Sequence, residues 1–116
     1  MDTMRPYAQV QRMYRDAPYW DKSSYGYSQE DVVDDILDGE IDDARCVMLA
    51  DPRKKTLTDI TRAVALEVAD ACGKIAYHER QMGVRARDAS TLLPSAVDFA
   101  EAHTDWRAPR WFHERE

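Results

Sequence analysis

Several features that mark common enzyme classes are missing from this chain. It contains only 4 glycines, with no glycine-rich phosphate-binding loop, and it has no serine in a nucleophile-elbow motif. The two cysteines, Cys46 and Cys72, do not form a CxxC pair, and their apolar surroundings predict buried free thiols. The 3 histidines show neither HxxxH nor HExxH spacing, so we expect no metal site built from histidines.

Long apolar runs are absent as well. No stretch approaches the ~20 apolar residues that a membrane-spanning helix needs, so we expect no membrane partner. The first residues lack the charged-then-apolar order of a signal peptide, which predicts a cytoplasmic protein. The length of 116 residues predicts one domain over residues 1–116, with little room for a separate catalytic lobe.

Negative charge is concentrated in one part of the chain. Acidic residues outnumber basic ones by 22 to 16, and the net charge is −6. The segment from Glu30 to Asp43 contains eight acids and no base. The rest of the chain contains the other 14 acids and all 16 bases. The acidic segment, residues 28–43, therefore makes the whole chain acidic, and from the net charge we expect no direct binding to nucleic acid.

Helical spacing dominates the prediction of the fold. Apolar residues recur at steps of three and four from Thr56 to Met82, which predicts a long central helix over residues 56–82. Shorter helices are predicted over residues 4–15, 28–39, 41–49 and 90–102. We therefore expect an all-α fold, a small bundle of four or five helices around the long one.

Residues 41–49 leave two alternatives open. The apolar run from Cys46 to Ala50 is too short for its periodicity to distinguish a helix from a strand. We prefer the helix, because no second strand is apparent in the sequence with which this run could pair.

Two segments rich in aromatic residues flank the predicted bundle. Proline, glycine and serine predict a loop over residues 17–27, and its rings either form a lid on the core or anchor a binding partner. The tail, residues 103–116, is predicted either to pack along the bundle as a strap or to act as a free recognition segment of arginine and tryptophan. The rings of the loop are Tyr19, Trp20, Tyr25 and Tyr27.

The predicted function is macromolecular binding. Carboxylates at each helical turn lie about 5 to 6 Å apart, as do phosphates along a nucleic-acid strand, so an acidic helix can occupy a cationic groove of a partner protein. Small acidic proteins of mobile elements that inhibit host defence complexes are similar in this broad sense. The predicted site combines the four loop rings with the outer aspartates of the helix, Asp31, Asp34, Asp35 and Asp38. The opposing interpretation is an ordinary solvated helix face.

An enzymatic alternative comes from two short acidic motifs. Glu67 and Asp70 have ExxD spacing, and Asp31-Val32-Val33-Asp34 supplies a second acidic pair. The pattern resembles the all-α nucleoside-triphosphate pyrophosphatases of the MazG type, whose ExxE motif is here replaced by DVVD. The resemblance implies Mg²⁺ as cofactor, which no other interpretation requires, and its ligands are then Glu67, Asp70, Asp31 and Asp34. The opposing interpretation is that Lys74 simply pairs with Asp70 on a solvated face.

A third candidate function is structural. Leu66 and Tyr77 fall on the far side of the long helix, among charged residues, and give it a minor second apolar face. Two copies of the chain can pack through such a face. A helical subunit that forms a homodimer is therefore a further alternative.

Overall fold

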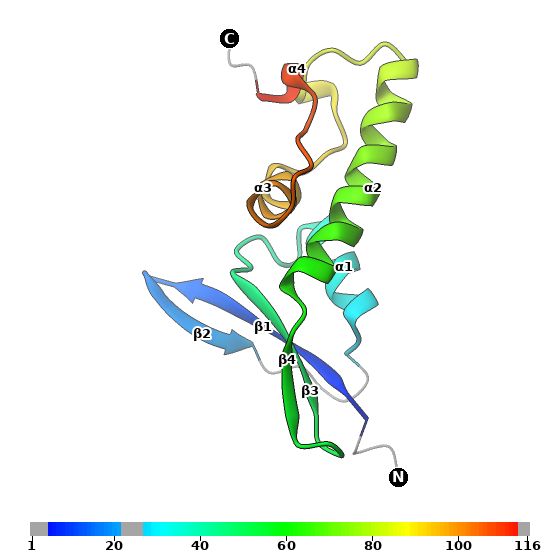
Figure 1. The fold of residues 1–116 in the computed structure, drawn as a ribbon. Helices are drawn as coiled ribbons and strands as arrows, with labels where there is room; N and C mark the ends of the chain where they lie inside the picture. The colour runs from blue at the N-terminus through cyan, green and yellow to red at the C-terminus, as the bar shows by residue number, and fades with distance from the viewer. Residues whose placement is uncertain (1–4, 22–26, 114–116) are drawn as a thin grey trace.

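A computed structural model describes residues 5–21 and 27–113 and contains a sheet as well as helices (Figure 1). The prediction of an all-α fold is wrong, because residues in four predicted helical or loop segments form strands. In chain order the elements are β1 (Tyr7–Tyr14), β2 (Ala17–Asp21), α1 (Gln29–Asp38), β3 (Cys46–Asp51), β4 (Thr56–Asp59), α2 (Thr61–Gln81), α3 (Pro94–His103) and α4 (Arg110–His113).

The four strands form one antiparallel sheet in the order β2-β1-β3-β4. In β1, Ala8 and Val10 are buried and alternate with half-exposed neighbours, which is the period of a strand and not of a helix. Arg15 and Asp16 join β1 to β2 with φ angles of 48° and 66°. Two positive φ angles make the tight turn that suits a hairpin, and Asn-Gly is its usual sequence signal. The predicted helix over residues 4–15 and the loop assigned to residues 17–21 are therefore corrected to a hairpin.

The apolar run at residues 46–50 is a strand, so the preferred helix over residues 41–49 is also wrong. Its partners are β1 and β4, both of which the helical spacing had assigned to helices. Asp51 accepts hydrogen bonds from the amides of Arg53 (3.1 Å) and Lys54 (3.3 Å) and so closes the turn into β4. The sequence did not reveal these strands, because each one is recognised only when the strand with which it pairs is also identified.

The long helix is confirmed over residues 61–81, but it begins five residues later than predicted, because Thr56–Asp59 forms β4. Asp59 accepts a hydrogen bond of 2.9 Å from the amide of Thr61, which satisfies a donor at the start of α2. The buried Thr61 hydroxyl accepts a hydrogen bond of 2.9 Å from the amide of Val47 and so ties the helix to β3. The chain therefore changes from strand to helix within two residues.

Helix α1 is predicted correctly. Ser28 and Asp31 form the expected capping box, with the Ser28 amide donating to Asp31 (2.8 Å) and the Asp31 amide donating to the Ser28 hydroxyl (3.2 Å). Gly39, at φ 83°, ends the helix in the left-handed conformation that glycine adopts readily.

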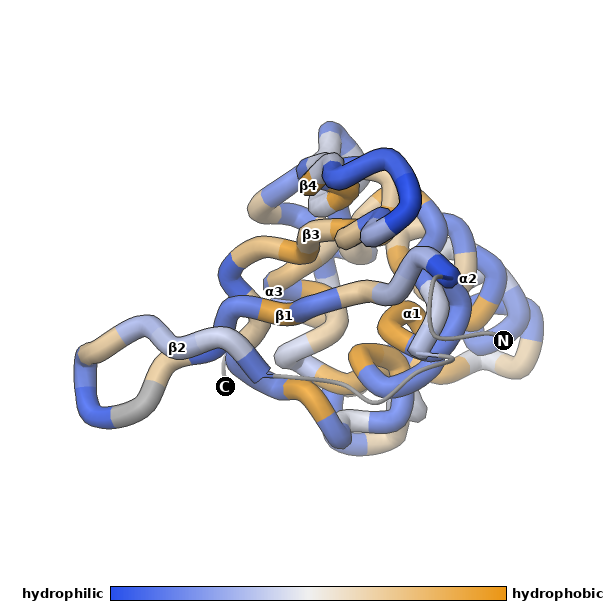
Figure 2. Tube along the Cα trace, turned by 90° about the horizontal axis from the view of Figure 1, so that it is seen from below, coloured by the Kyte–Doolittle hydropathy of each residue, from blue (hydrophilic) through white to orange (hydrophobic). Residues whose placement is uncertain are grey.

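Helix α1 packs against β1 and α2 contacts β3, but most of α2 rises away from the sheet, and α3 packs on it there (Figure 1). One buried cluster runs through the sheet and these three helices. The molecule is elongated, about 50 × 31 × 22 Å, and the β1–β2 hairpin projects beyond the rest of it (Figure 2). The described part of the tail packs as a strap, with Ala108 and Phe112 buried. No helix among the described residues is long and apolar enough to cross a membrane.

Candidate binding surfaces

Helix α1 divides its four predicted site aspartates between solvent and the protein itself. Asp34 and Asp38 are exposed, whereas Asp31 and Asp35 are half-buried. Asp31 belongs to the capping box, and Asp35 accepts a hydrogen bond of 2.6 Å from the Tyr27 hydroxyl. Only two of the four aspartates therefore remain available to a partner.

The exposed carboxylates of α1 follow nearly one line along the helix. Glu30, Asp34 and Asp38 stand four residues apart and are all exposed. At a rise of about 1.5 Å per residue, successive positions lie about 6 Å apart along the axis. Within residues 5–21 and 27–113, no lysine or arginine forms an ion pair with any of the three. We call these three residues the acidic stripe.

The predicted aromatic residues do not form one cluster. Tyr27 packs against the core, and burial, followed by its hydrogen bond to Asp35, raises the pKa of its hydroxyl, which therefore stays a donor. Tyr19 and Trp20 lie on β2, each 41% exposed, and neighbours on a strand point to opposite faces. Tyr25 lies outside the described residues.

A cleft of about 270 Å³ lies between the hairpin and α1. Its lining includes three carboxylates, from Asp21, Asp35 and Glu40. Arg12 of β1 also lines it, and its guanidinium lies 2.6 Å from Asp43 and 3.5 Å from Asp21. The hydrogen bond to Asp43 raises the pKa of Arg12. The chain thus neutralises part of its own acidic segment here and joins the hairpin to it, while no lysine or arginine in the described ranges pairs with the acidic stripe.

The alternative metal site does not come together. Glu67 accepts a hydrogen bond of 2.6 Å from the Gln29 side chain, but Asp70 pairs with Lys74 at 3.0 Å on the exposed face of α2. In the part of the chain that the structure describes, no three His, Cys, Asp or Glu side chains are grouped so that they could hold a metal ion. The predicted ligands Glu67, Asp70, Asp31 and Asp34 therefore do not form one metal site. The sheet also differs from the all-α fold that the resemblance implied.

A larger recess, of about 790 Å³, lies at the opposite end of the molecule, between the second half of α2 and residues 106–111. Among the described residues that line it there is no aspartate or glutamate. We call it the arginine groove, after the charged members of its lining. Its arginines are Arg80, Arg85, Arg107 and Arg110, and its aromatic residues are Tyr77, Trp106 and Trp111.

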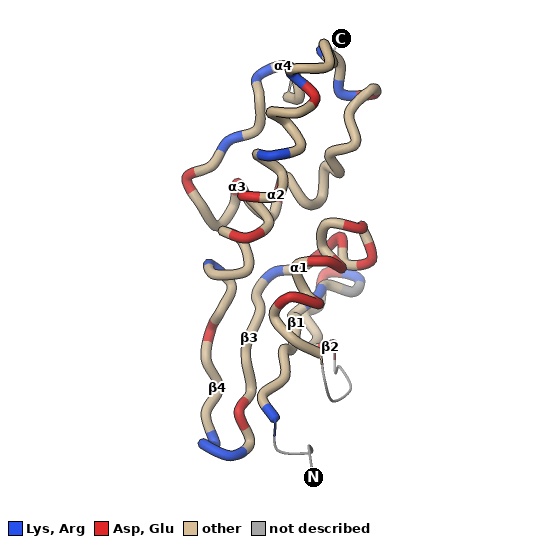
Figure 3. The backbone as a smooth tube through the Cα atoms, turned by 90° about the vertical axis from the view of Figure 1, so that its right-hand side faces the viewer, with Lys and Arg blue, Asp and Glu red and all other residues tan. Residues whose placement is uncertain are grey.

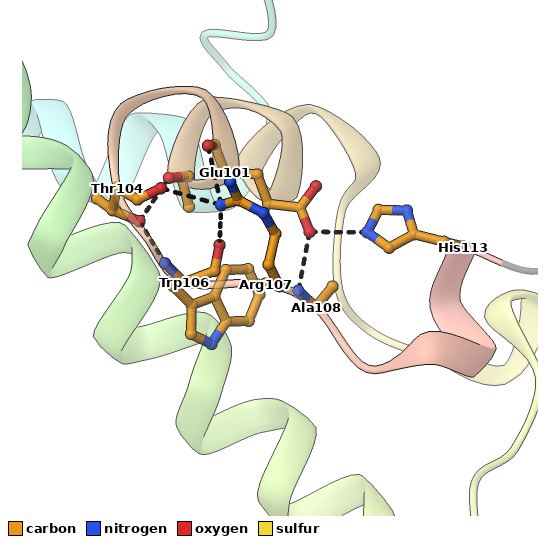
Figure 4. Close-up of polar contacts among 7 residues, drawn as sticks. Glu101, Thr104, Trp106, Arg107, Ala108 and His113 are labelled. Carbon is orange, nitrogen blue, oxygen red and sulfur yellow. Dashed lines mark hydrogen bonds and ion pairs between the residues drawn. The ribbon is translucent and has the colours of Figure 1, made fainter.

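The wall of the groove opposite α2 is tied to the end of α3 (Figure 4). The buried Thr104 hydroxyl donates to the Ala100 carbonyl (2.7 Å) and accepts from the Trp106 amide (3.1 Å). Arg107 donates to the carbonyls of Glu101 (3.2 Å), Thr104 (3.0 Å) and Trp106 (2.7 Å). These bonds fix the backbone that carries Trp106, whose indole nitrogen lies against Gly73 of α2.

Glu101 holds the far end of the same wall. Its carboxylate accepts hydrogen bonds from the Ala108 amide (2.8 Å) and, when His113 carries a proton on Nε2, from that nitrogen (2.7 Å) (Figure 4). Burial by itself raises the pKa of Glu101, but these bonds outweigh it and hold the pKa below its ordinary value. The segment with Trp111 is therefore attached to α3 at both of its ends.

Sequence reasoning did not predict the groove. The tail was predicted to be either a packed strap or a recognition segment, and the structure combines a packed backbone with arginine and tryptophan side chains that line a recess. The available signal was the spacing of arginines at residues 80 and 85 and their repetition in the tail, but only the tertiary fold shows that the two meet.

Two candidate surfaces of opposite charge therefore lie on this molecule. Acidic residues gather around α1 and the loop after it, whereas basic residues lie at the β3–β4 turn and near α4 (Figure 3). Comparisons with protein families, characterised sequences and solved structures gave no match.

Proposed function

We propose that this protein binds a partner protein through the acidic stripe of α1 and the neighbouring hairpin. The observation that carries the proposal is the line of three exposed carboxylates, Glu30, Asp34 and Asp38, none of which pairs with a lysine or arginine of the described residues. Like charges four residues apart cost a helix a few tenths of a kcal/mol per pair, and no ion pair with a described lysine or arginine offsets that cost. A cationic partner surface removes it.

The hairpin supplies an aromatic contact, which the charged residues of the stripe do not provide. Electrostatic attraction speeds association, but tight complexes also need desolvated aromatic anchors. Trp20 lies partly exposed on the edge strand β2. The next residue of this strand, Asp21, lines the cleft between the hairpin and α1. Partner lysines or arginines at the stripe and an apolar contact at Trp20 together define the proposed interface.

The proposed partner is a protein whose cationic groove normally holds nucleic acid, so this protein acts as its inhibitor in the cytoplasm. The spacing of the acidic stripe, about 6 Å per step, supports this class of partner because it resembles the phosphate spacing of a strand. The mimicry rests on three carboxylates along one helix, not on the four aspartates proposed from the sequence.

The test compares two charge-matched variants. Asp34→Asn with Asp38→Asn removes two charges of the stripe, whereas Asp88→Asn with Asp105→Asn removes two exposed charges elsewhere. Immobilised wild-type protein and both variants are used to capture partners from a cell extract at low and high salt. We expect the stripe variant to lose the partner that the control variant retains, and we expect the captured partner to release bound nucleic acid. Equal capture by both variants contradicts the proposal.

Homodimerisation is a second candidate, because the face predicted to mediate it is exposed. Leu66 is 49% exposed and Tyr77 is 67% exposed on α2. Sedimentation of the wild type and of Leu66→Lys distinguishes this function. A dimer that Leu66→Lys dissociates supports it, and a dimer that only the stripe variant dissociates makes a second copy the partner of the acidic stripe.

A further inference from the structure

We propose that the arginine groove binds a nucleotide unit, that is, a phosphate joined through a sugar to a planar base. The unit is either a free nucleotide or part of a single-stranded nucleic acid. This site lies at the other end of the molecule from the acidic stripe and does not depend on the function proposed above.

The charge of the groove favours an anion with several oxygens. Arg80 and Arg85 are exposed, and no carboxylate in the described part of the chain forms an ion pair with either. The groove brings them close to Arg107 and Arg110, with no acid in its described lining. The planar guanidinium group matches a phosphate with two parallel hydrogen bonds, and gathered positive charge is stabilised by such a ligand.

The rings of the groove favour a ligand that is planar as well as charged. Trp106 and Trp111 are half-buried on a backbone held by Thr104 and Glu101, so the backbone that carries the two rings is fixed before a ligand arrives. Tyr77 faces them from α2 and is 67% exposed. Bases stack on such side chains in proteins that bind single strands, at about 1–3 kcal/mol per base. An acidic peptide can pair with the arginines, but its carboxylate side chains have no planar ring to stack on the three aromatic residues.

The size of the groove fits a nucleotide and leaves room for a chain. Its volume of about 790 Å³ lies within the range of pockets that hold small ligands. A second recess of about 430 Å³ continues along α2 and shares Gly73, Tyr77 and Trp106 with it. The one acid in its described lining, Asp70, is paired with Lys74. A strand can therefore follow α2 past both recesses.

The net charge of −6 does not oppose this site. That value led us to expect no direct nucleic-acid binding, but it averages over a molecule whose acids gather around α1 and whose groove is lined by arginines. At physiological salt, charges more than about 8 Å apart are largely screened from one another. The local charge of the groove, and not the total, governs a bound phosphate.

Fluorescence of the full chain tests the proposal. Trp20→Phe removes the tryptophan on the hairpin and leaves Trp106 and Trp111, both in the groove, as the reporters. The probes are an oligothymidylate of about 12 nucleotides, adenosine monophosphate, inorganic phosphate and a polyglutamate peptide. Quenching by the oligonucleotide supports a strand site, and quenching by the mononucleotide with no further gain from the oligonucleotide supports a free-nucleotide site.

A matched pair of variants locates the binding. Arg80→Gln with Arg85→Gln removes two charges of the groove, and Arg53→Gln with Lys54→Gln removes two from the β3–β4 turn. We expect the groove variant to bind about tenfold more weakly or worse, and its affinity to depend less on salt, while the turn variant stays within about twofold of the wild type. Tyr77→Ala should weaken binding of the oligonucleotide but not of inorganic phosphate.

Three results overturn the proposal. They are equal affinities of the groove and turn variants, equal binding of polyglutamate and oligonucleotide, and the absence of tryptophan quenching by any probe with a base. Far-ultraviolet circular dichroism of each variant confirms that the fold is retained, as expected for substitutions at exposed positions.

Discussion

Glu79 is a buried acid whose hydrogen bonds join α2 to the segment before α3. Its carboxylate accepts bonds from the Ser90 hydroxyl (2.6 Å), the Thr91 amide (2.6 Å) and the Thr91 hydroxyl (3.1 Å). Burial by itself raises the pKa of Glu79, and these bonds outweigh it, so the pKa lies below its ordinary value of 4.5. A carboxylate with a lowered pKa stabilises the fold only while it is ionised.

We therefore predict that Glu79→Gln lowers the free energy of unfolding at neutral pH by about 1–3 kcal/mol, because it leaves three partly buried donors poorly matched. The wild type should lose this contribution as the pH falls below 4.5 and through the lowered pKa of Glu79, so the two proteins converge in acid. Urea unfolding at neutral and acidic pH measures the effect, with the exposed Glu40→Gln as control. A constant difference between wild type and Glu79→Gln at both pH values contradicts the assignment.

The two cysteines differ in burial, although the sequence predicted both to be buried. Both are free; Cys72 is buried and Cys46 is half-buried on β3. Burial raises the pKa of the Cys72 thiol to about 11. Because thiolates and not thiols react, we predict that a thiol reagent modifies Cys46 first and Cys72 only after urea is added. The native Cys46→Ser protein reports on Cys72 alone, and the native Cys72→Ser protein reports on Cys46 alone. Equal rates of modification in the two proteins refute this prediction.

At the scale of elements, the β1–β2 hairpin depends on a turn in which two non-glycine residues, Arg15 and Asp16, have positive φ angles. Asp16 adopts φ 66°, a conformation that glycine reaches without the steric cost of a Cβ atom. We predict that Asp16→Gly raises the free energy of unfolding by about 1 kcal/mol. Thermal unfolding measures the change, and Ala17→Gly, which places glycine within β2, is the control and should not stabilise. No gain from Asp16→Gly argues against the positive φ angle.

The same turn explains why sequence reasoning failed at β1. A two-residue hairpin is signalled by Asn-Gly or Asp-Gly, and Arg15-Asp16 carries no such signal. Without a turn, Tyr7, Val10 and Tyr14 fit a helical stripe. By contrast, α1 carries its own capping box and glycine stop, so its limits were predicted to within a residue.

At the scale of the whole molecule, the buried cluster joins the sheet to the helices without a break. Val10 and Val47 of the sheet belong to the same cluster as Val32, Val68 and Val97 of the helices. We predict that the chain unfolds in one cooperative step. Urea transitions followed by circular dichroism and by tryptophan fluorescence of Trp20→Phe should coincide. Two separate transitions show instead that the groove end unfolds independently.

The sequence alone determined the features that depend on near neighbours along the chain. The acidic segment, helix α1 with its caps, most of α2 and the exposed Leu66 and Tyr77 all follow from spacing within a few turns. The absence of a histidine-ligand pattern and the concentration of charge were readable in the same way. None of these features requires knowledge of what lies across the molecule.

Only the tertiary structure decided which segments pair and which side chains meet. A strand is stable only beside another strand, so β1, β3 and β4 could not be recognised one at a time. The hydrogen bond between Asp35 and Tyr27, and the common groove that Arg80 and Trp111 line, depend on how the fold places these residues in space. Long-range contact, which local spacing does not encode, therefore settled both the sheet and the groove.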